Sequence, residues 1–176
     1  MDFFTVLQAR RSIRAFHSTP VEEAIVWRIV EAANCAPSAG NLQAYTLVLV
    51  RDPQRKRALA KAAWEQAFIA QAPVVLVFLA DALRSQRRYG QRGATLYAVQ
   101  DATIACAYAQ MAATALGLGS CWVGAFDETA VRSIVGAPPD LRPVAMLPIG
   151  YAAESPPPTG RRALHDLVHH EQVSAY

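Results

Sequence analysis

The chain has 176 residues, of which 53% are hydrophobic and 18% are charged. This length suits one domain with a substantial core and is too short for two ordinary domains, so we expect a single domain over residues 1–176. The net charge of +3 is too small to indicate nucleic-acid binding. The longest apolar run, Ala72–Ala80, is less than half as long as a bilayer requires, so we expect no membrane span.

Two further features concern compartment and assembly. The sequence contains 3 cysteines without metal-binding or redox spacing, and we interpret them as reduced, mostly buried thiols. The first residues carry Asp2 in a short helical pattern rather than a secretory leader, which favours a cytoplasmic protein. The high hydrophobic content indicates that part of the surface is buried against a second subunit, so we expect a homodimer.

The N-terminal segment combines a short helix with a basic stretch. Phe3, Phe4 and Leu7 have the spacing of one apolar helix face, which predicts a helix anchored by that face. The stretch Arg10–Phe16 then brings three guanidinium groups and a hydroxyl close together. Because the planar fork of arginine binds phosphate through paired hydrogen bonds, we interpret this stretch as an anion cradle. Charge alone supports a solvated basic turn equally well.

The next elements alternate between helix and strand. Ser18–Pro20 supplies a cap and an early proline, which predicts a helix start, and the apolar pattern continues to about Ala36. Gly40 and Asn41 are residue types that adopt positive φ, so the sequence after Pro37 is expected to form a loop. A strand over 45–50 and a helix over 54–67 follow.

The second half of the chain contains the clearest strand. Ala72–Leu79 is continuously apolar, which predicts a central strand covered on both faces. Arg84–Thr95 contains four arginines and lacks periodicity, so we expect a mobile loop with a solvated charge run, with a functional lid as the alternative. Leu96–Leu116 reads as a long alanine-rich helix that permits close helix packing.

The remaining expectations are strands over 121–126 and 143–152, a helix over 128–135 and an extended proline-rich arm over 154–176. Strands mixed with helices in this way indicate an α+β domain.

Four motifs in this order resemble the nitroreductase family of flavin-dependent oxidoreductases. They are Arg10-x-Ser12-x-Arg14, Pro37-Ser38-x-x-Asn41-x-Gln43, the segment 115–126 and the segment 160–171. The resemblance implies a nitroreductase-like fold, with a central, mainly antiparallel sheet flanked by helices in an entwined homodimer. It also implies FMN bound at the subunit interface and NADH or NADPH as reductant. Electrons would then pass to a nitroaromatic or quinone by a ping-pong mechanism.

The resemblance further assigns cofactor-binding roles to individual residues. It implies that Arg10, Arg11 and Ser12 hold the phosphate and that Arg14 approaches the pyrimidine edge of the flavin. It implies that one subunit offers its partner's flavin the residues Pro37, Ser38, Ala39, Asn41 and Gln43. Within the segment 123–125, the backbone of Val123 and Gly124 is expected near flavin N5, with Gln66 near the pyrimidine and Arg161 and Arg162 adding cations at the phosphate.

Taken without the resemblance, several of these residues have plainer readings. Asn41 is typical of a turn, Gly124 of a β-bulge and Arg14 of a surface ion pair. The family often has a second hydroxyl where this chain has Ala39. His165 and His169 have a spacing that can bind zinc, but no third ligand is evident, so we expect no metal site. No side-chain acid or base is required, because the flavin carries the chemistry.

Other functions remain open at this stage. On the same fold, the chain could be a flavin-dependent dehydrogenase or a flavin-cleaving enzyme. From a different class, it could be a module that binds flavin without turnover. A nucleic-acid-binding domain would depend on Arg84–Arg92, where Tyr89 is the only interleaved aromatic residue.

Overall fold

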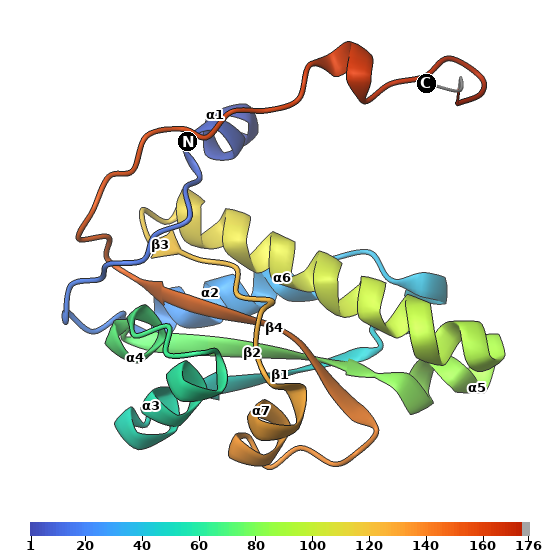
Figure 1. The fold of residues 1–176 in the computed structure, drawn as a ribbon, viewed down its shortest axis with the longest axis horizontal. Coiled ribbons are helices and arrows are strands. Elements are labelled where there is room, and N and C mark those ends of the chain that lie inside the picture. The colour runs from blue at the N-terminus through green and yellow to red at the C-terminus, as the bar shows by residue number, and fades with distance from the viewer. Residues whose placement is uncertain (174–176) are drawn as a thin grey trace.

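Four strands form one antiparallel sheet at the centre of the fold (Figure 1). The computed structural model describes residues 1–173, so residues 174–176 of the expected arm lie outside the described residues. The strand order is β1-β2-β4-β3. The bounds are β1 Tyr45–Val50, β2 Val74–Asp81, β3 Gly119–Ser120 and β4 Leu141–Gly150. The predicted α+β class and antiparallel sheet are confirmed.

Strand β2 is the centre of the hydrophobic core. It pairs with β1 on one side and β4 on the other, and every residue from Val74 to Ala80 is buried. Its side chains alternate between two core clusters because successive strand residues point to opposite faces. Val75, Val77 and Leu79 pack toward α3, α4 and α7, while Val74, Leu76 and Phe78 pack toward α2 and α6. The prediction of a central strand covered on both faces is therefore confirmed.

Helices cover both faces of the sheet, with α2 and α6 on one side and α3 and α7 on the other (Figure 1). The long helix α6 begins and ends close to its predicted bounds, and five of its eight buried residues are alanine. The bounds are α1 Phe3–Ala9, α2 Glu23–Asn34, α3 Pro53–Ala62, α4 Phe68–Gln71, α5 Ala82–Arg92, α6 Ala98–Ala115 and α7 Glu128–Ile134. Shorter helical turns cover Ala39–Asn41, Gly93–Tyr97 and Leu164–Asp166.

Two predicted helices differ in their bounds. Helix α2 begins at Glu23, so Ser18–Pro20 does not cap it, and Glu22 at the N-cap makes no side-chain capping bond. The predicted helix over 54–67 ends at Ala62, because Trp64 and Glu65 adopt positive φ values of 54° and 61°. This break directs the chain into α4 and leaves Gln66 in the intervening turn.

The expectation of a mobile loop at Arg84–Thr95 is wrong. The carboxylate of Asp81 accepts a hydrogen bond from the Arg84 amide at 2.9 Å and caps α5. A π-helical turn over Gly93–Tyr97 then joins α5 to α6. A Cβ on Gly93 would lie 2.5 Å from the carbonyl oxygen of Ser85, so only glycine permits this close packing. Gly90 adopts a positive φ of 58° within α5, so the segment is helical with a break at this glycine, which disrupts any regular periodicity.

The predicted strand over 121–126 is also shorter than expected. Regular pairing with β4 covers only β3, and Val123 returns to β4 through an isolated bridge to Met146. The amide of Val123 donates to Met146 O at 2.9 Å, and the amide of Met146 donates back to Val123 O at 2.9 Å. The segment after β3 therefore follows the sheet edge with irregular backbone.

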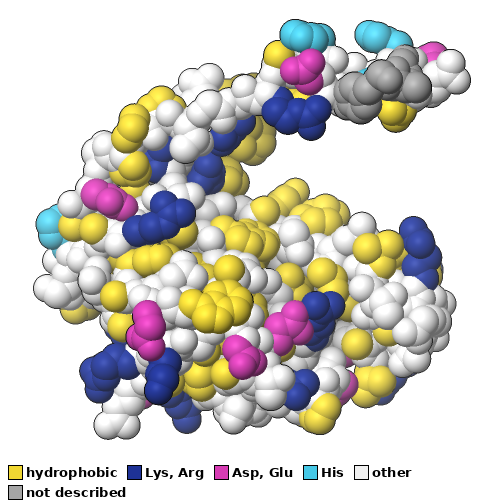
Figure 2. All heavy atoms as spheres, in the orientation of Figure 1, with side chains coloured by type: hydrophobic (Ala, Val, Ile, Leu, Met, Phe, Trp, Pro, Cys, Tyr) yellow, Lys and Arg dark blue, Asp and Glu magenta, His cyan; other side chains and the backbone are white. Residues whose placement is uncertain are grey.

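Helix α1 does not anchor through the face that its sequence pattern suggests. Phe3, Phe4 and Leu7 are 64%, 71% and 44% exposed, and Val6 is the buried residue of this helix. The arm over 154–173 passes α1 and stands clear of the rest of the molecule, leaving an open space beneath it (Figure 2). Within residues 1–173, no helix combines the length and apolarity needed to cross a membrane.

Candidate functional site

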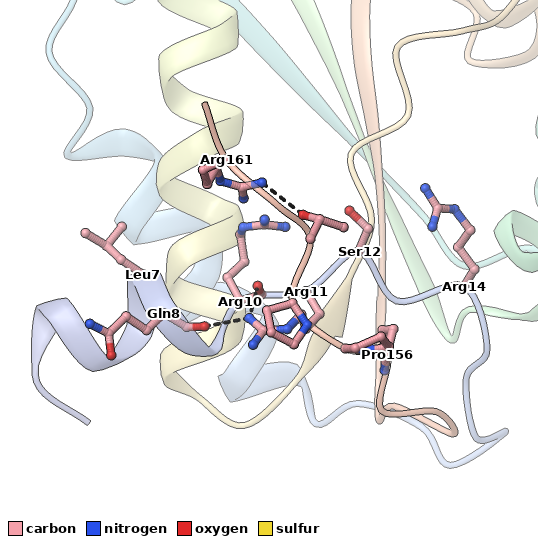
Figure 3. A pocket seen from close by; sticks show the side chains of 11 residues that line it. Leu7, Gln8, Arg10, Arg11, Ser12, Arg14, Pro156 and Arg161 are labelled. Carbon is pink, nitrogen blue, oxygen red and sulfur yellow. Dashed lines mark hydrogen bonds between the residues drawn. The ribbon is translucent and has the colours of Figure 1, made fainter. Parts of the chain in front are cut away.

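A basic pocket lies where the segment after α1 meets the beginning of the arm (Figure 3). Its volume is about 520 Å³. None of the described residues that line it is acidic. The lining residues are Leu7, Gln8, Arg10, Arg11, Ser12, Arg14, Pro156, Pro157, Pro158, Thr159 and Arg161. The pocket therefore gathers the predicted phosphate residues together with one C-terminal arginine.

Backbone pairing holds this basic segment against the sheet. The amide of Ile13 donates to Ser120 O at 3.0 Å, and Ser12 forms a parallel bridge with Ser120. The arm begins beside the same segment, because the amide of Ala153 donates to Ala15 O at 2.9 Å. The side chain of Ile13 lies so close to Gly119 that a Cβ there would be 2.9 Å from it. The position of Ser12 is thus set by β3 and by the chain leaving β4.

The arginines of the pocket differ in how far their donors are already used. Arg10 has no side-chain hydrogen bond to any residue in 1–173, whereas Arg11 donates to the carbonyls of Gln8 and Arg10. Arg161 donates to Thr159 Oγ1 at 2.9 Å and to the carbonyl of Gly160 at 3.1 Å. Since a guanidinium has five N–H donors, each retains capacity for an anion.

Two predicted cations lie apart from Arg10 and Arg161, although Arg14 still lines the pocket. Arg14 extends on the far side of Ser12 from Arg10 and Arg161 (Figure 3), and its backbone amide donates to the carboxylate of Glu154. Arg162 does not line the pocket and donates to the carbonyl of Asp166. Of the two C-terminal arginines, only Arg161 lies within the basic pocket of the described chain.

The pocket also has a thiol neighbour that sequence reasoning missed. Burial raises the pKa of Cys121, while the nearby charge of Arg14 and a hydrogen bond with Ser12 partly oppose that rise. Cys121 is 2% exposed, so it lies beneath the basic segment rather than in it. The spacing of Cys121 from the other cysteines does not predict this position. Only the pairing of β3 with the segment at Ser12 brings Cys121 close to the basic pocket.

The second motif forms a tight loop with unusual backbone. Gly40, Asn41 and Gln43 have φ values of 55°, 56° and 44°, which confirms the positive φ predicted for Gly40 and Asn41. The hydroxyl of Ser38 accepts a hydrogen bond from the Gln43 amide at 2.9 Å. The side chain of Gln43 donates to Asn41 Oδ1 at 2.6 Å. The polar groups of the motif therefore organise the loop itself.

Asp101 on α6 clamps this loop, a role that sequence reasoning missed. Its carboxylate accepts hydrogen bonds from the amides of Ala39 at 2.9 Å and Ala44 at 3.3 Å. The residue is 2% exposed and has no ion-pair partner within residues 1–173. The sequence did offer one signal, since Asp101 is the single acid in an alanine-rich helix. A carboxylate buried there requires hydrogen-bond donors, which indicates a structural role.

A second cavity of about 540 Å³ lies beside the loop. In the described chain it shares no lining residue with the basic pocket. It is lined by Pro37, Ser38, Ala39, Tyr97, Val99, Gln100, Asp101, Thr103 and Ile104. Asn41 is exposed beside it and Gln43 is half-buried. One chain therefore places the two motifs in separate hollows.

The segment at Val123 and Gly124 offers exposed backbone. Val123 is buried, whereas Gly124 and Ala125 are exposed. The amide of Gly124 has no hydrogen-bond acceptor among residues 1–173. Gln66 reaches the same segment, since its Nε2 donates to the carbonyls of Ala125 at 3.3 Å and Ala63 at 3.0 Å. In the described part of the chain, no three His, Cys, Asp or Glu residues are grouped as a metal site would require.

Comparison with known proteins places the chain in a family. The family model described as "Nitroreductase family" matches residues 7–68 and 64–151. A protein of Thermus thermophilus named NADH dehydrogenase is 36% identical over 96% of this chain and 95% of its own length. A protein of Bacillus subtilis named FMN reductase (NAD(P)H) is 33% identical over 84% of this chain and 65% of its own length.

A solved structure has the same fold. The NADPH:FMN oxidoreductase from Vibrio harveyi complexed with NAD+ superposes with a TM-score of 0.91 and 26% sequence identity, over 99% of this chain and 79% of that chain. The family model covers the first three of the four motifs and ends before the segment 160–171, and the solved structure agrees with the antiparallel sheet observed here. The chain belongs to the nitroreductase family.

Proposed function

We propose that this protein is an FMN-dependent oxidoreductase that passes electrons from NADH or NADPH to an electron-poor acceptor such as a nitroaromatic or a quinone. The observation that carries the proposal is the acid-free pocket lined by Arg10, Arg11, Ser12, Arg14 and Arg161. The relatives named as FMN reductase and as NADPH:FMN oxidoreductase support the same reaction class.

The residues of the pocket fit the phosphate end of FMN. A phosphate monoester is a dianion with several acceptor oxygens, and charge-assisted hydrogen bonds from guanidinium groups satisfy them. Arg10 has its donors unused within residues 1–173, and the hydroxyl of Ser12 lies between Arg10 and Arg14 (Figure 3). We assign the phosphate to Arg10, Ser12 and Arg161, with Arg11 fixing the turn through its bonds to backbone carbonyls.

The residues that we assign to the flavin ring would contribute a backbone amide, at Gly124, and a positive charge, at Arg14. The exposed amide of Gly124 would supply a donor for flavin N5, and the bridge from Val123 to β4 would hold that amide in position. Arg14 lies apart from Arg10 and Arg161 (Figure 3), and in this proposal its charge would face the pyrimidine edge of the flavin. A fixed cation at that edge favours negative charge there. Bound flavin would supply the hydride chemistry, and the nicotinamide and the acceptor would occupy one site against the flavin in turn.

We further propose a homodimer in which the loop 37–43 of one subunit completes the site of the other. The separate position of the two motif cavities within one chain supports this assembly. So do the exposed apolar side chains of α1 and of the arm, which are Phe3, Phe4, Leu7, Leu164, Leu167 and Val168. In this proposal residues 1–176 are one domain, and the arm over 154–176 extends over the partner.

We also propose that the enzyme works in the cytoplasm. All three cysteines, Cys35, Cys106 and Cys121, are free thiols. Unpaired thiols are typical of a reducing compartment.

The proposal is tested by reconstituting purified protein with FMN. We expect a flavin absorbance band, NAD(P)H oxidation with menadione or a nitroaromatic, parallel lines in two-substrate kinetics and twice the monomer mass by light scattering. Arg10→Ala should weaken FMN binding about 10- to 100-fold, which corresponds to loss of a charge-assisted hydrogen bond. The matched control is Arg57→Ala, an exposed arginine on α3.

The alternatives give different results. Protein that binds FMN but oxidises neither nicotinamide with any acceptor is a flavin-binding module. Protein that consumes oxygen and breaks down its flavin, as shown by product analysis, is a flavin-cleaving enzyme. Protein that acquires no flavin band refutes the proposal.

A further inference from the structure

The helix α5 and the π-helical turn after it form a cationic wall beside the cavity at the loop 37–43. From Ala82 to Tyr97 the chain contains four arginines and no acidic residue. The guanidinium groups of Arg84, Arg87, Arg88 and Arg92 have no carboxylate partner within residues 1–173. Four unneutralised cations on one element favour an anionic ligand.

The wall is in direct contact with the loop that we assign to the flavin. Arg84 Nε donates to the carbonyl of Leu42, and Arg88 donates to the carbonyl of Gly40 at 3.2 Å. The hydroxyl of Tyr89 lies over Gly40, where an added Cβ would be 2.4 Å away from it. Helix α5 therefore packs against the loop 37–43, which in the proposed function contacts the flavin ring.

Two of the arginines are held against an aromatic pair. The rings of Tyr89 and Tyr97 meet edge to face with centroids 5.2 Å apart. The guanidinium of Arg88 lies 5.5 Å from the centre of the Tyr89 ring, and that of Arg92 lies 5.4 Å from the centre of the Tyr97 ring. Such stacking orients a guanidinium while leaving its edge donors available.

Arg92 is the better placed of the two for a ligand in the cavity. Its Nε donates to the hydroxyl of Tyr97 at 3.0 Å, and Tyr97 itself lines the cavity. Its two terminal nitrogens have no hydrogen-bond partner in the described chain. Arg88 already uses one terminal nitrogen on Gly40. Among residues 1–173, no arginine lines the cavity itself, but the free guanidinium edge of Arg92 lies next to Tyr97, which does, and Arg88 lies against the adjoining ring of Tyr89.

We propose that Arg92, supported by Arg88, binds the 2′-phosphate of NADPH and makes this protein prefer NADPH to NADH. The inference rests on the proposed function, because it assumes that a nicotinamide dinucleotide reaches the flavin beside the loop 37–43. The two dinucleotides differ only by a phosphate on the adenosine ribose. An arginine edge forms paired hydrogen bonds with that phosphate, and NADH offers it only a neutral hydroxyl.

The first experiment compares kcat/KM for NADPH and NADH with one fixed acceptor. Wild-type protein should prefer NADPH, and Arg92→Ala should lower kcat/KM for NADPH about 10- to 100-fold, as expected for a lost charged hydrogen bond. The value for NADH should change less than about twofold, and Arg92→Lys should retain part of the preference. Arg57→Ala is the matched control, because it removes one charge from an exposed residue on α3, outside the arginine helix.

The second experiment measures binding without turnover. In calorimetry, wild-type protein should bind 2′,5′-ADP more tightly than 5′-ADP, and Arg92→Ala should abolish the difference. Equal kcat/KM for both dinucleotides in the wild type, or equal loss for both in Arg92→Ala, overturns the inference. So does equal binding of the two adenosine nucleotides by the wild type, a result that needs no variant.

The two proposals fail in different ways. A protein that binds FMN and oxidises NADH as well as NADPH retains the proposed function and loses this inference. A protein that gains no flavin band and oxidises neither dinucleotide loses the proposed function. The calorimetric comparison then still decides whether Arg92 recognises the phosphate.

Discussion

Replacing Asp101 with alanine should destabilise the protein and loosen the loop 37–43. The carboxylate is 2% exposed and accepts two backbone hydrogen bonds, from Ala39 at 2.9 Å and Ala44 at 3.3 Å. A hydrogen bond to a charged group contributes roughly 1.5–3 kcal/mol. Since one of the two bonds is long, we expect Asp101→Ala to lower the free energy of unfolding by about 3–4 kcal/mol. Asp101→Asn keeps an acceptor oxygen and should lose about half of that amount.

The assay is urea unfolding followed by circular dichroism, with FMN titration of the folded variants. Gln100→Ala is the control, because this neighbour on α6 is exposed. The affinity for FMN should fall in Asp101→Asn while the basic pocket stays intact, since the loop and the pocket share no lining residue in the described chain. A loss of stability below about 1 kcal/mol for Asp101→Ala would refute the clamp, because that is the scale of a single neutral hydrogen bond.

Three further predictions concern the loop, the thiols and a surface ion pair. Gly40→Ala should cost about 1–3 kcal/mol in urea unfolding, because φ is 55° and the new Cβ would lie 2.4 Å from the Tyr89 hydroxyl; unchanged stability would contradict this. A thiol reagent should modify the exposed Cys35 in native protein and reach the two buried cysteines only after unfolding, as counted by mass spectrometry. A hydrogen bond from Arg142 lowers the pKa of Glu128 below its usual value of 4.5, so this pair stabilises the protein above pH 4.5 and the effect is lost as pH falls through the lowered pKa. Both side chains are about half exposed, so Glu128→Gln should cost less than about 1 kcal/mol at pH 7, and a larger loss would indicate a role beyond the ion pair.

The local sequence pattern was sufficient to predict an element whose residues are uniformly buried, or a turn whose residue types favour positive φ. The continuous apolar run predicted β2 as a central strand because a strand buried on both faces has no polar positions. The alanine-rich run predicted α6 close to its true bounds. Gly40 and Asn41 were expected to adopt positive φ, and both do. In each case the residues themselves restrict the backbone.

Local pattern failed where a distant contact decides the conformation. Residues 84–95 show no periodicity, yet they are helical on both sides of a break at Gly90, because Asp81 caps α5 and Gly93 packs on Ser85. Phe3 and Leu7 suggested a buried face for α1, but within one chain there is nothing for that face to cover.

For the site, the sequence by itself determined the kinds of group available and the family to which the chain belongs. It supplied the clustered arginines, the hydroxyl of Ser12 and the turn residues of the second motif. Only the tertiary structure decided that Arg161 joins the basic pocket while Arg162 does not, that Asp101 clamps the loop, and that the two motifs occupy separate hollows of one chain. The physical reason is that these positions depend on strand pairing and packing between residues far apart in sequence, which no local spacing encodes.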